Sequence, residues 1–446
     1  MIPAKYFAQF VTSAMLVFAA PLLAQDEPQE ILFRDVRVFD GSGETLSAPT
    51  NVLIRGNVIA DIGPDARASR SDATIIEGRR RTLMPGLIDN HVHMIFNSLS
   101  PAQMLQPDMS VERIVGLSAA QSEAMLLRGF TAVRDVGGPS FPLKALIDSG
   151  KARGPRIWPS GPMISQTSGH ADLRLPDEPS RRFSGKIPRA EQVWASVIAD
   201  GRAEVLTAVR ENLRFGASQI KISAGGGTSS SYDPLDVTQY TLDEMTAAVE
   251  AADDYNTYVT VHAYHEKSVR RAIEAGVKVI EHGNLLDEAT LRLMAEKGVW
   301  LSAQMLADST EAMDPARRVK REPVIAGQRR VWPIAKRLGV KLAWGTDFLF
   351  EPDLNQQQNA YILRLTPFFA PAELLKLVTH DNAQLLALSG PRSPYQGKLG
   401  VIEEGALADI LLVNGNPLSD IDLIGDPARN FDVIMKDGVI YKRTDR

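Results

Sequence analysis

Eight short apolar segments, separated by helical stretches, constrain the fold of residues 83–390 more than any other feature of this chain. Alternating strands and helices are typical of parallel sheets, because each helix returns the chain to the start of the next strand. Eight such units favour an α/β protein built as a closed (β/α)8 TIM barrel over an open sheet. The predicted strands cover 87–94, 131–135, 156–160, 219–223, 258–262, 277–282, 300–303 and 341–347, and the predicted helices include 111–128, 203–215, 242–256, 266–275 and 287–297.

The two ends of the chain carry a different pattern, made of short strands and glycine turns. Near the N-terminus the predicted strands cover 31–33, 36–39, 52–54 and 58–59, and near the C-terminus they cover 408–413, 433–435 and 439–441. Turns such as Arg55-Gly56-Asn57 and Lys436-Asp437-Gly438 are typical of hairpins. Because chain ends often lie close together in domains, we expect a small β-sandwich of residues 25–82 plus 391–446 beside a barrel of residues 83–390.

Residues 1–24 have the pattern of a secretory signal peptide. Lys5 is the only charge before Asp26, residues 10–24 are almost wholly apolar, and Ala24 stands where a signal peptidase cuts. The apolar run falls short of the roughly 20 residues that span a bilayer, although a retained N-terminal anchor is the alternative. We therefore expect a mature protein that starts near Gln25, is periplasmic or secreted, and does not insert stably into the membrane.

Composition excludes several classes of chemistry. The chain has 0 cysteines, which rules out disulfides, thiolate metal ligands, cysteine nucleophiles and lipid attachment after the signal. The formal net charge of −5 comes without a basic stripe that would follow a phosphate backbone, so nucleic acid is not an expected partner. Any metal ion must be held by nitrogen and oxygen atoms.

Polar side chains stand at the ends of the predicted strands, which is where (β/α)8 barrels carry their chemistry. Two histidines form a His-x-His pair at the end of the first strand, so both rings lie on one face of it. A lysine lies in the fourth strand, histidines end the fifth and sixth, and an aspartate ends the eighth. Imidazole nitrogen is the commonest ligand for zinc and similar metals. The candidate ligands are His91, His93, Lys221, His262, His282 and Asp347.

Each candidate has an ordinary structural alternative. A single histidine is often a core residue whose hydrogen bonds are made within the protein. The alternative for Lys221 is a surface lysine whose aliphatic stem lies along apolar groups. The alternative role for Asp347 is to cap a helix that follows the eighth strand. Glu281, next to His282, has the pattern of a residue that orients a ligand rather than one that binds metal. These alternatives would have to coincide at five strand ends, so the joint pattern predicts a metal site.

With these motifs the chain resembles the metal-dependent amidohydrolase superfamily, in its binuclear branch with a carboxylated lysine. The resemblance covers nearly everything after the signal segment and includes Pro85-Gly86-Leu87-Ile88-Asp89, 381–388, 397–402 and 405–409. Within the superfamily the chain is most similar to exported Xaa-Pro and Xaa-Arg dipeptidases, a group that includes ochratoxin-hydrolysing amidohydrolases. Residues 166–170 and 232–234 carry this closer similarity.

The resemblance implies two divalent metal ions, with zinc as the expected metal and manganese, cobalt or iron as alternatives. His91, His93 and Asp347 would hold the more buried ion, and His262 and His282 the second. Lys221 would bridge both after reacting with CO2 to form a carbamate. A hydroxide shared by the two metals would attack the amide carbonyl, with Asp347 as general base and then general acid.

His170 and Tyr232 resemble residues that contact the scissile carbonyl as electrophilic partners in the dipeptidase group, with ordinary loop polarity as the alternative. His265 and His380 are expected to lie outside the site. Phenylalanines 96, 348 and 350 favour an apolar subsite.

The predicted function is that of a dipeptidase, a carboxypeptidase-like enzyme or an N-acyl-amino-acid hydrolase, with ochratoxin-type amides to phenylalanine among its substrates. A cyclic amide or lactone hydrolase, or a deaminase, of the same superfamily is the alternative among enzymes. A catalytically silent barrel that serves binding or assembly is the alternative outside enzymes. A small-molecule amide or dipeptide is the expected partner, and the resemblance implies a homo-oligomer.

Overall fold

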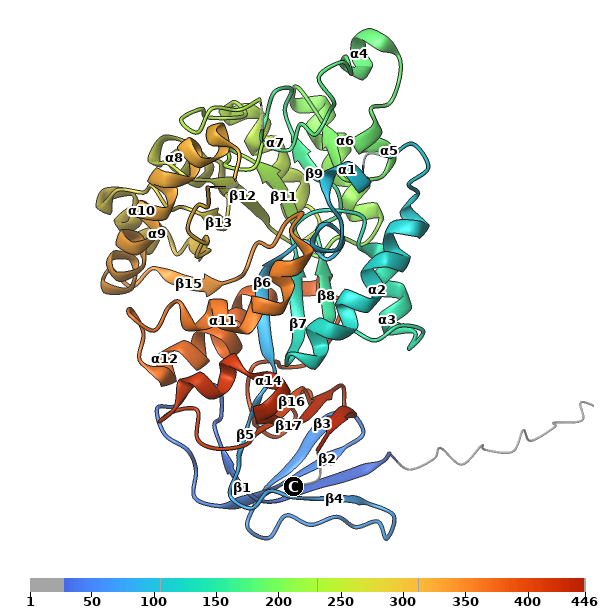
Figure 1. Cartoon of the computed structure of the whole chain (residues 1–446), viewed down its shortest axis with the longest axis vertical. Helices are drawn as coiled ribbons and strands as arrows, with labels where there is room; N and C mark the ends of the chain where they lie inside the picture. The colour runs from blue at the N-terminus through green and yellow to red at the C-terminus, as the bar shows by residue number, and fades with distance from the viewer. Residues whose placement is uncertain (1–27, 105, 231, 312, 445–446) are drawn as a thin grey trace, which may run out of the picture.

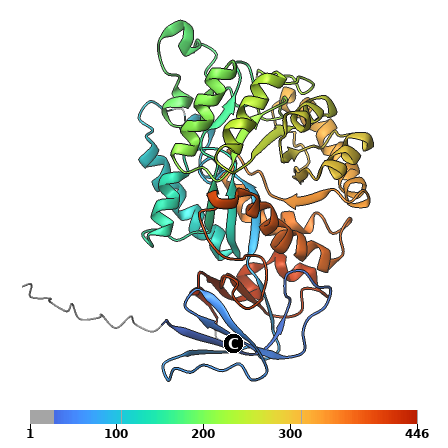
Figure 2. The ribbon, with the colours of Figure 1, turned by 180° about the vertical axis from the view of Figure 1, so that it is seen from behind.

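A computed structural model describes residues 28–104, 106–230, 232–311 and 313–444. The predicted signal segment of residues 1–24 lies outside these described residues. A sheet that contains both chain ends occupies the lower part of the molecule in Figure 1, and parallel strands with surrounding helices form the larger part above it. Figure 2 shows the same two parts from behind. No helix among the described residues is long and apolar enough to cross a membrane.

The lower part is an eight-stranded sheet with the order β18-β17-β16-β5-β1-β2-β3, in which β4 pairs with β1. β5 joins the two chain ends, because it pairs with β1 on one side and antiparallel with β16 on the other. The structure thus confirms strands near all the terminal segments predicted from sequence, whereas the sandwich and the domain limits stay predictions. The strands are β1 (Glu30–Val38), β2 (Thr50–Arg55), β3 (Val58–Gly63), β4 (Thr74–Glu77), β5 (Thr82–Pro85), β16 (Ile410–Val413), β17 (Phe431–Lys436) and β18 (Val439–Arg443).

All eight strands predicted for the middle of the chain are present, and every pairing among them is parallel. They belong to two sheets, β6-β7-β8 and β10-β9-β11-β12-β13-β14-β15, so this topology does not confirm closure into one barrel. β9 and β10 were not predicted. The strands are β6 (Leu87–Val92), β7 (Phe130–Asp135), β8 (Arg156–Pro159), β9 (Met163–Ser165), β10 (Ser196–Ile198), β11 (Ile220–Ser223), β12 (Val259–Ala263), β13 (Val279–His282), β14 (Trp300–Ala303) and β15 (Lys341–Trp344).

Helices surround these parallel strands in both views (Figures 1 and 2). The five predicted helices are confirmed to within a few residues as α2, α6, α7, α8 and α9, and α7 begins with a capping box between Thr241 and Glu244. The helices are α1 (Pro101–Met104), α2 (Val111–Leu127), α3 (Phe141–Asp148), α4 (Arg181–Ser184), α5 (Arg189–Gln192), α6 (Arg202–Arg214), α7 (Leu242–Asp253), α8 (Glu266–Ala275), α9 (Glu288–Lys297), α10 (Pro315–Arg337), α11 (Gln358–Leu363), α12 (Pro371–Lys376), α13 (Asn382–Leu386) and α14 (Pro427–Asn430).

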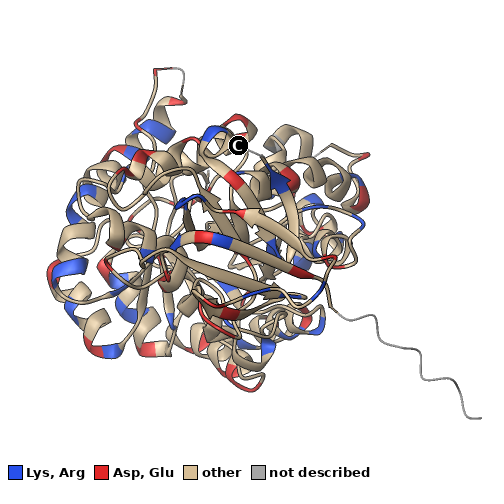
Figure 3. Ribbon diagram, turned by 90° about the horizontal axis from the view of Figure 1, so that it is seen from below, with Lys and Arg blue, Asp and Glu red and all other residues tan. Residues whose placement is uncertain are grey.

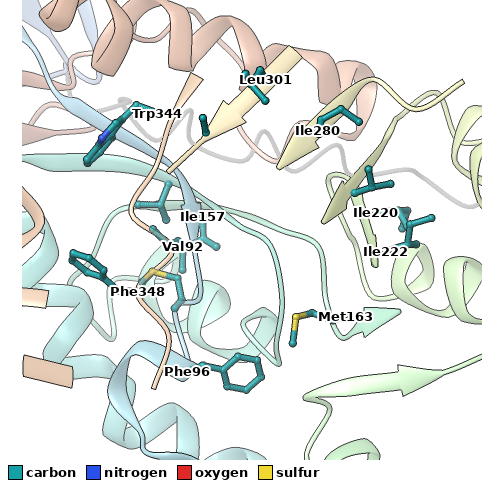
Figure 4. Close-up of a cluster of buried hydrophobic side chains, with 14 of the residues drawn as sticks. Val92, Phe96, Ile157, Met163, Ile220, Ile222, Ile280, Leu301, Trp344 and Phe348 are labelled. Carbon is teal, nitrogen blue, oxygen red and sulfur yellow. The ribbon is translucent and has the colours of Figure 1, made fainter. Parts of the chain in front are cut away.

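One buried apolar cluster fixes the positions of the parallel strands. Figure 4 shows side chains of this cluster from several strands, among them Val92, Ile220, Ile280, Leu301 and Trp344, all buried. Burial of each such side chain contributes about 1.5–3 kcal/mol relative to exposure. Charged residues lie instead on the outer helices and on the terminal sheet, with both signs interspersed in the view from below (Figure 3). The polar side chains among the strands are therefore the exception that calls for a functional explanation.

A buried ion pair joins the terminal sheet to the parallel strands. Arg156 on β8 donates from Nε and Nη2 to the two carboxylate oxygens of Asp409, both at 3.1 Å, and from Nη2 to Asp437 at 2.7 Å. Only 7% of the Arg156 side chain and 2% of the Asp409 side chain are exposed.

Asp409→Asn is expected to lower the free energy of unfolding by about 3 kcal/mol, because it leaves the buried guanidinium without its main counter-charge. Urea unfolding of the variant measures this loss. Asp437→Asn is the matched control and should cost clearly less, because the Asp437 side chain is 45% exposed. Equal stability of the wild type and Asp409→Asn would show that the pair does not hold the two parts together.

Candidate active site

The six predicted ligands lie in or just beyond the carboxyl-terminal parts of five parallel strands, and all line one cavity. His91 is the second-to-last residue of the strand β6, His93 lies just beyond its end, and Asp347 follows shortly after β15. Lys221 lies in β11, His262 in β12 and His282 at the end of β13. The four histidines and Lys221 are buried, with 3% of their surface or less exposed.

Three of these side chains form a compact cluster. Nε2 of His91 lies 3.1 Å and Nε2 of His93 lies 3.3 Å from Oδ1 of Asp347. Among the described histidines, aspartates and glutamates, this is the group of three whose ligand atoms lie within 4.8 Å of one another. Nε2 of His91 is buried and has no hydrogen-bond partner among the described residues. Two nitrogens and a carboxylate oxygen that face one another in this way suit a divalent cation.

Hydrogen bonds to one ring nitrogen of His91, His93 and His262 fix which nitrogen of each of these rings carries the lone pair. Nδ1 of His91 lies 2.8 Å from the Glu281 carboxylate, and Nδ1 of His93 lies 3.2 Å from the Gly137 carbonyl. Nε2 of His262 lies 3.1 Å from the Gly226 carbonyl. Carboxylates and carbonyls only accept, so each of these nitrogens donates and its opposite nitrogen is free to bind metal. The free atoms are Nε2 of His91 and His93 and Nδ1 of His262.

Glu281 is itself held by a buried cation. Nη2 of Arg134, whose side chain is fully buried, donates to Oε1 of Glu281 at 2.6 Å, while Nε of Arg134 donates to the Asn90 carbonyl at 2.7 Å. Burial alone would raise the pKa of Glu281, but Arg134 and His91 hold it well below its usual range. The carboxylate therefore stays ionised and orients the His91 ring.

Asp347 occupies a constrained position. Its backbone has φ of 54°, a conformation that is uncommon outside glycine, and its N–H donates to the His91 carbonyl at 2.8 Å. A Cβ at Gly345 would overlap His91, so only glycine lets this segment pass so close to β6. Burial alone would raise the pKa of Asp347, but the neighbouring imidazoles of His91 and His93 hold it well below its usual range.

His282 and Lys221 lie beside this cluster. Nδ1 of His282 is 3.9 Å from Oδ2 of Asp347, and the His262 and His282 ring centroids are 4.4 Å apart. The Lys221 amine forms no hydrogen bond or ion pair with any described residue, although Lys221 is only 3% exposed. Burial lowers its pKa to about 8, which makes the neutral amine accessible. A buried amine without a partner fits a residue that reacts to form a charged ligand.

His170, in the segment after β9, lies against His262 and is held by the loop after β11. The two rings stack with centroids 3.7 Å apart, and Nδ1 of His170 lies 2.9 Å from Ser230 Oγ and 3.3 Å from an oxygen of Asp233. Lys320 of α10 fastens this loop, because its ammonium donates to the carbonyls of Gly227, Ser230 and Asp233 at 2.7–3.0 Å.

The cavity above the cluster has a volume of about 370 Å³. Its floor is polar, whereas many of its wall residues are apolar or aromatic, including Met305, Phe348, Phe350, Leu354 and Tyr361. Such a combination of apolar walls with a few fixed polar groups is typical of sites for small organic molecules.

Comparison with known proteins agrees with this geometry. The amidohydrolase family matches residues 82–442, which is most of the chain. The chain belongs to the amidohydrolase family. It is an enzyme that hydrolyses amide C–N bonds, in a family whose members are generally metal-dependent.

Three relatives span this amidohydrolase almost completely. Ochratoxinase from Aspergillus niger is 29% identical over 438 residues, which cover 94% of this chain and 88% of the relative. A prolidase crystallised with N-methylphosphonate-L-proline is 33% identical, with a TM-score of 0.84 over 93% of this chain and 100% of the prolidase. A Xaa-Pro dipeptidase crystallised with methionine is 32% identical, with a TM-score of 0.79 over 93% of this chain and 100% of the dipeptidase.

The structure brings His170 into the amidohydrolase cavity but places Tyr232 differently. Tyr232 is 38% exposed, and its hydroxyl donates to the Arg174 carbonyl at 3.0 Å. Phe348 and Phe350 line the cavity as expected, whereas Phe96 is fully buried behind His93, with ring centroids 6.0 Å apart.

Sequence reasoning also missed residues that support the site. Arg134, Ser230 and Lys320 act through contacts with residues far away in the sequence, and no local motif marks them. His265 lies outside the cluster, as predicted, at the N-cap of α8.

Glu281→Gln is expected to weaken metal binding by about 10- to 100-fold, the usual cost of losing a partner that orients a ligand. Glutamine keeps the shape but loses the charge that holds the His91 tautomer. Competition with a chromophoric chelator measures the affinity. Glu288→Gln, an exposed change at the start of α9, is the control and should leave metal affinity unchanged. Unchanged affinity in Glu281→Gln would remove Glu281 from the site.

Proposed function

We propose that this amidohydrolase is a dipeptidase or N-acyl-amino-acid hydrolase that releases the C-terminal amino acid from small amides, ochratoxin-type amides to phenylalanine among them. The observation that carries the proposal is the buried cluster of His91, His93 and Asp347 at the floor of a cavity with apolar walls. The similarity to an ochratoxinase, a prolidase and a Xaa-Pro dipeptidase supports the substrate class.

The donor set fits a centre of two divalent ions, with zinc as the proposed metal. The proposed ligands are His91, His93, Lys221, His262, His282 and Asp347. Lys221 would bind as a carbamate, because a protonated amine has no lone pair and a carbamate offers two anionic oxygens. When bound, the metal ions would lower the pKa of water toward about 7 and polarise the amide carbonyl.

Asp347 is the proposed general base and general acid. Its low pKa keeps the carboxylate ionised, so that it can take a proton from the attacking water. It then passes the proton to the nitrogen of the leaving amine, which must leave as a neutral group. The hydrogen bond from the Asp347 N–H to His91 holds the carboxylate at the cluster during both transfers.

His170 and Tyr232 are the proposed partners of the scissile carbonyl. Nδ1 of His170 is engaged by Ser230 and Asp233, which orients the ring and leaves Nε2 for the substrate oxygen. Tyr232 reaches the same oxygen only after its hydroxyl leaves the Arg174 carbonyl. The proposal therefore assigns Tyr232 to a form of the loop that closes on substrate.

The remaining structural expectations form part of the proposal. We infer that the two parallel sheets close into a (β/α)8 barrel, because the Asp347 N–H bonds the His91 carbonyl between the segments after β15 and in β6. The terminal strands would form the small sandwich of residues 25–82 plus 391–446. Residues 1–24 support export to the periplasm or medium, and the protein would act as a homo-oligomer.

Chromatography of the products from N-acyl-phenylalanine, Xaa-Pro and Xaa-Arg substrates tests the function. We expect free amino acids from metal-loaded protein and none from His91→Ala. Failure of all three substrate classes would contradict the peptidase assignment. Release of ammonia from a heterocycle, or opening of a cyclic amide or lactone, would favour the alternative enzymes of this family.

A further inference from the structure

One buried arginine in the cavity wall lacks a direct anionic partner among the described residues. Arg321 on α10 lines the cavity and is only 7% exposed. Nη2 donates to the Ala307 carbonyl at 2.8 Å, but Nε is buried without a partner, and no described carboxylate forms an ion pair with Arg321. A guanidinium stays charged in proteins, so its burial without an anion costs free energy.

The neighbouring cations on α10 are already engaged. Nη2 of Arg317 lies 3.0 Å from a carboxylate oxygen of Glu351, and Lys320 donates to three carbonyls of the loop after β11. Burial and the nearby Arg317 lower the pKa of Arg321, whereas the charge of Glu351 acts in the opposite direction. Of the three α10 cations Arg317, Lys320 and Arg321, Arg321 is therefore the one that is available to bind a ligand.

Arg321 lines the same cavity as the cluster of candidate metal ligands. Tyr264 lines the same cavity as Arg321, and the Tyr264 ring lies 5.0 Å from the ring of His282. A group bound by Arg321 would therefore share the cavity with the candidate metal ligands, beside apolar walls that suit a hydrophobic side chain.

We propose that Arg321 binds the free α-carboxylate of the amino acid that leaves, and so selects substrates with a C-terminal carboxylate. The inference rests on the proposed hydrolase function and adds the group that the substrate must carry. Guanidinium and carboxylate match in shape and charge, and the pair is strongest where water is excluded. The substrate thus supplies the anion that the folded chain lacks.

The test compares N-acetyl-L-phenylalanine with its C-terminal primary amide, and acetate release reports cleavage of the same bond in both. The wild type should favour the acid. Arg321→Gln should lower kcat/KM for the acid by about 10- to 150-fold, the range for a hydrogen bond to a charged group, and should leave the amide unchanged. Arg321→Lys should restore part of the preference. Arg337→Gln changes an exposed arginine at the other end of α10 and should behave as wild type.

Binding and stability give readouts that do not depend on turnover. Calorimetry should show that L-phenylalanine binds the wild type more tightly than L-phenylalaninamide, and that Arg321→Gln removes the difference. The Tm of Arg321→Gln should equal or exceed that of the wild type, because an unpaired buried charge is removed. A large fall in Tm together with equal losses for acid and amide would show a structural role and overturn the inference.

The remaining outcomes separate this inference from the proposed function. Equal cleavage of acid and amide by the wild type would overturn the inference and leave the hydrolase standing. Cleavage of neither would contradict the proposed function for this substrate, and the calorimetric comparison would then decide the role of Arg321 by itself.

Discussion

Asp347→Asn is expected to reduce kcat for amide hydrolysis by about 10²- to 10⁴-fold, because asparagine can neither take the proton of the attacking water nor return it to the leaving amine. It also removes an anionic oxygen from the cluster with His91 and His93. Asparagine is nearly the same size, and the backbone bond from position 347 to the His91 carbonyl does not depend on the side chain. The fold should therefore survive, and circular dichroism checks that it does.

Initial rates of acetate release from N-acetyl-L-phenylalanine measure this loss. Asp353→Asn is the matched control, since Asp353 is exposed nearby in the sequence and does not line the cavity. The control should keep the wild-type rate. Near-normal kcat in Asp347→Asn would rule out the proposed proton transfers and leave Asp347 as a residue of the fold alone.

Lys221→Met is expected to lower hydrolysis by about 10³-fold, which corresponds to about 4 kcal/mol of transition-state stabilisation. Methionine fills the buried space next to Ile220 and Ile222 but cannot form a carbamate. The variant should also bind less metal than the wild type, as measured by mass spectrometry of the metal content. Added formate should restore part of the activity, because a small carboxylate can take the place of the carbamate oxygens.

A structural role for Lys221 predicts a different result. In that case Lys221→Met would keep its metal content and activity or would unfold, and formate would change nothing. Lys278→Met, an exposed change before β13, controls for the loss of a positive charge and should match the wild type. Full activity in Lys221→Met would contradict the bridging role.

The candidate ligands could be found from the sequence because their signals are local. Each lies at the end of an apolar segment whose strand character is evident from a few residues, and parallel strands bring their carboxyl ends to one side. His91 and Asp347 are thus in contact although they are far apart in the sequence. The family resemblance added roles to these residues, but the strand ends already grouped them.

The other features of the fold and the site depend on tertiary contacts that no local sequence pattern reveals. β9 and β10 have three residues each, too few to give a periodic signal, and α10 contains Pro323 and Pro333, which disfavour a helix prediction. Arg321 stands in a segment rich in charged residues, a composition typical of solvent-exposed segments. Only the folded chain shows that this guanidinium is buried at the cavity.

Titration of metal-free protein with Zn²⁺ tests the central claim most directly, with N-acetyl-L-phenylalanine hydrolysis and metal content measured in the same samples. We expect no hydrolysis after chelation and activity that reaches its plateau at about two equivalents per chain, as for a two-metal centre. Bicarbonate should be needed for full recovery, since the proposed bridging ligand is a carboxylated Lys221. Activity in the chelated protein, or a plateau at one equivalent that does not respond to bicarbonate, would contradict the account.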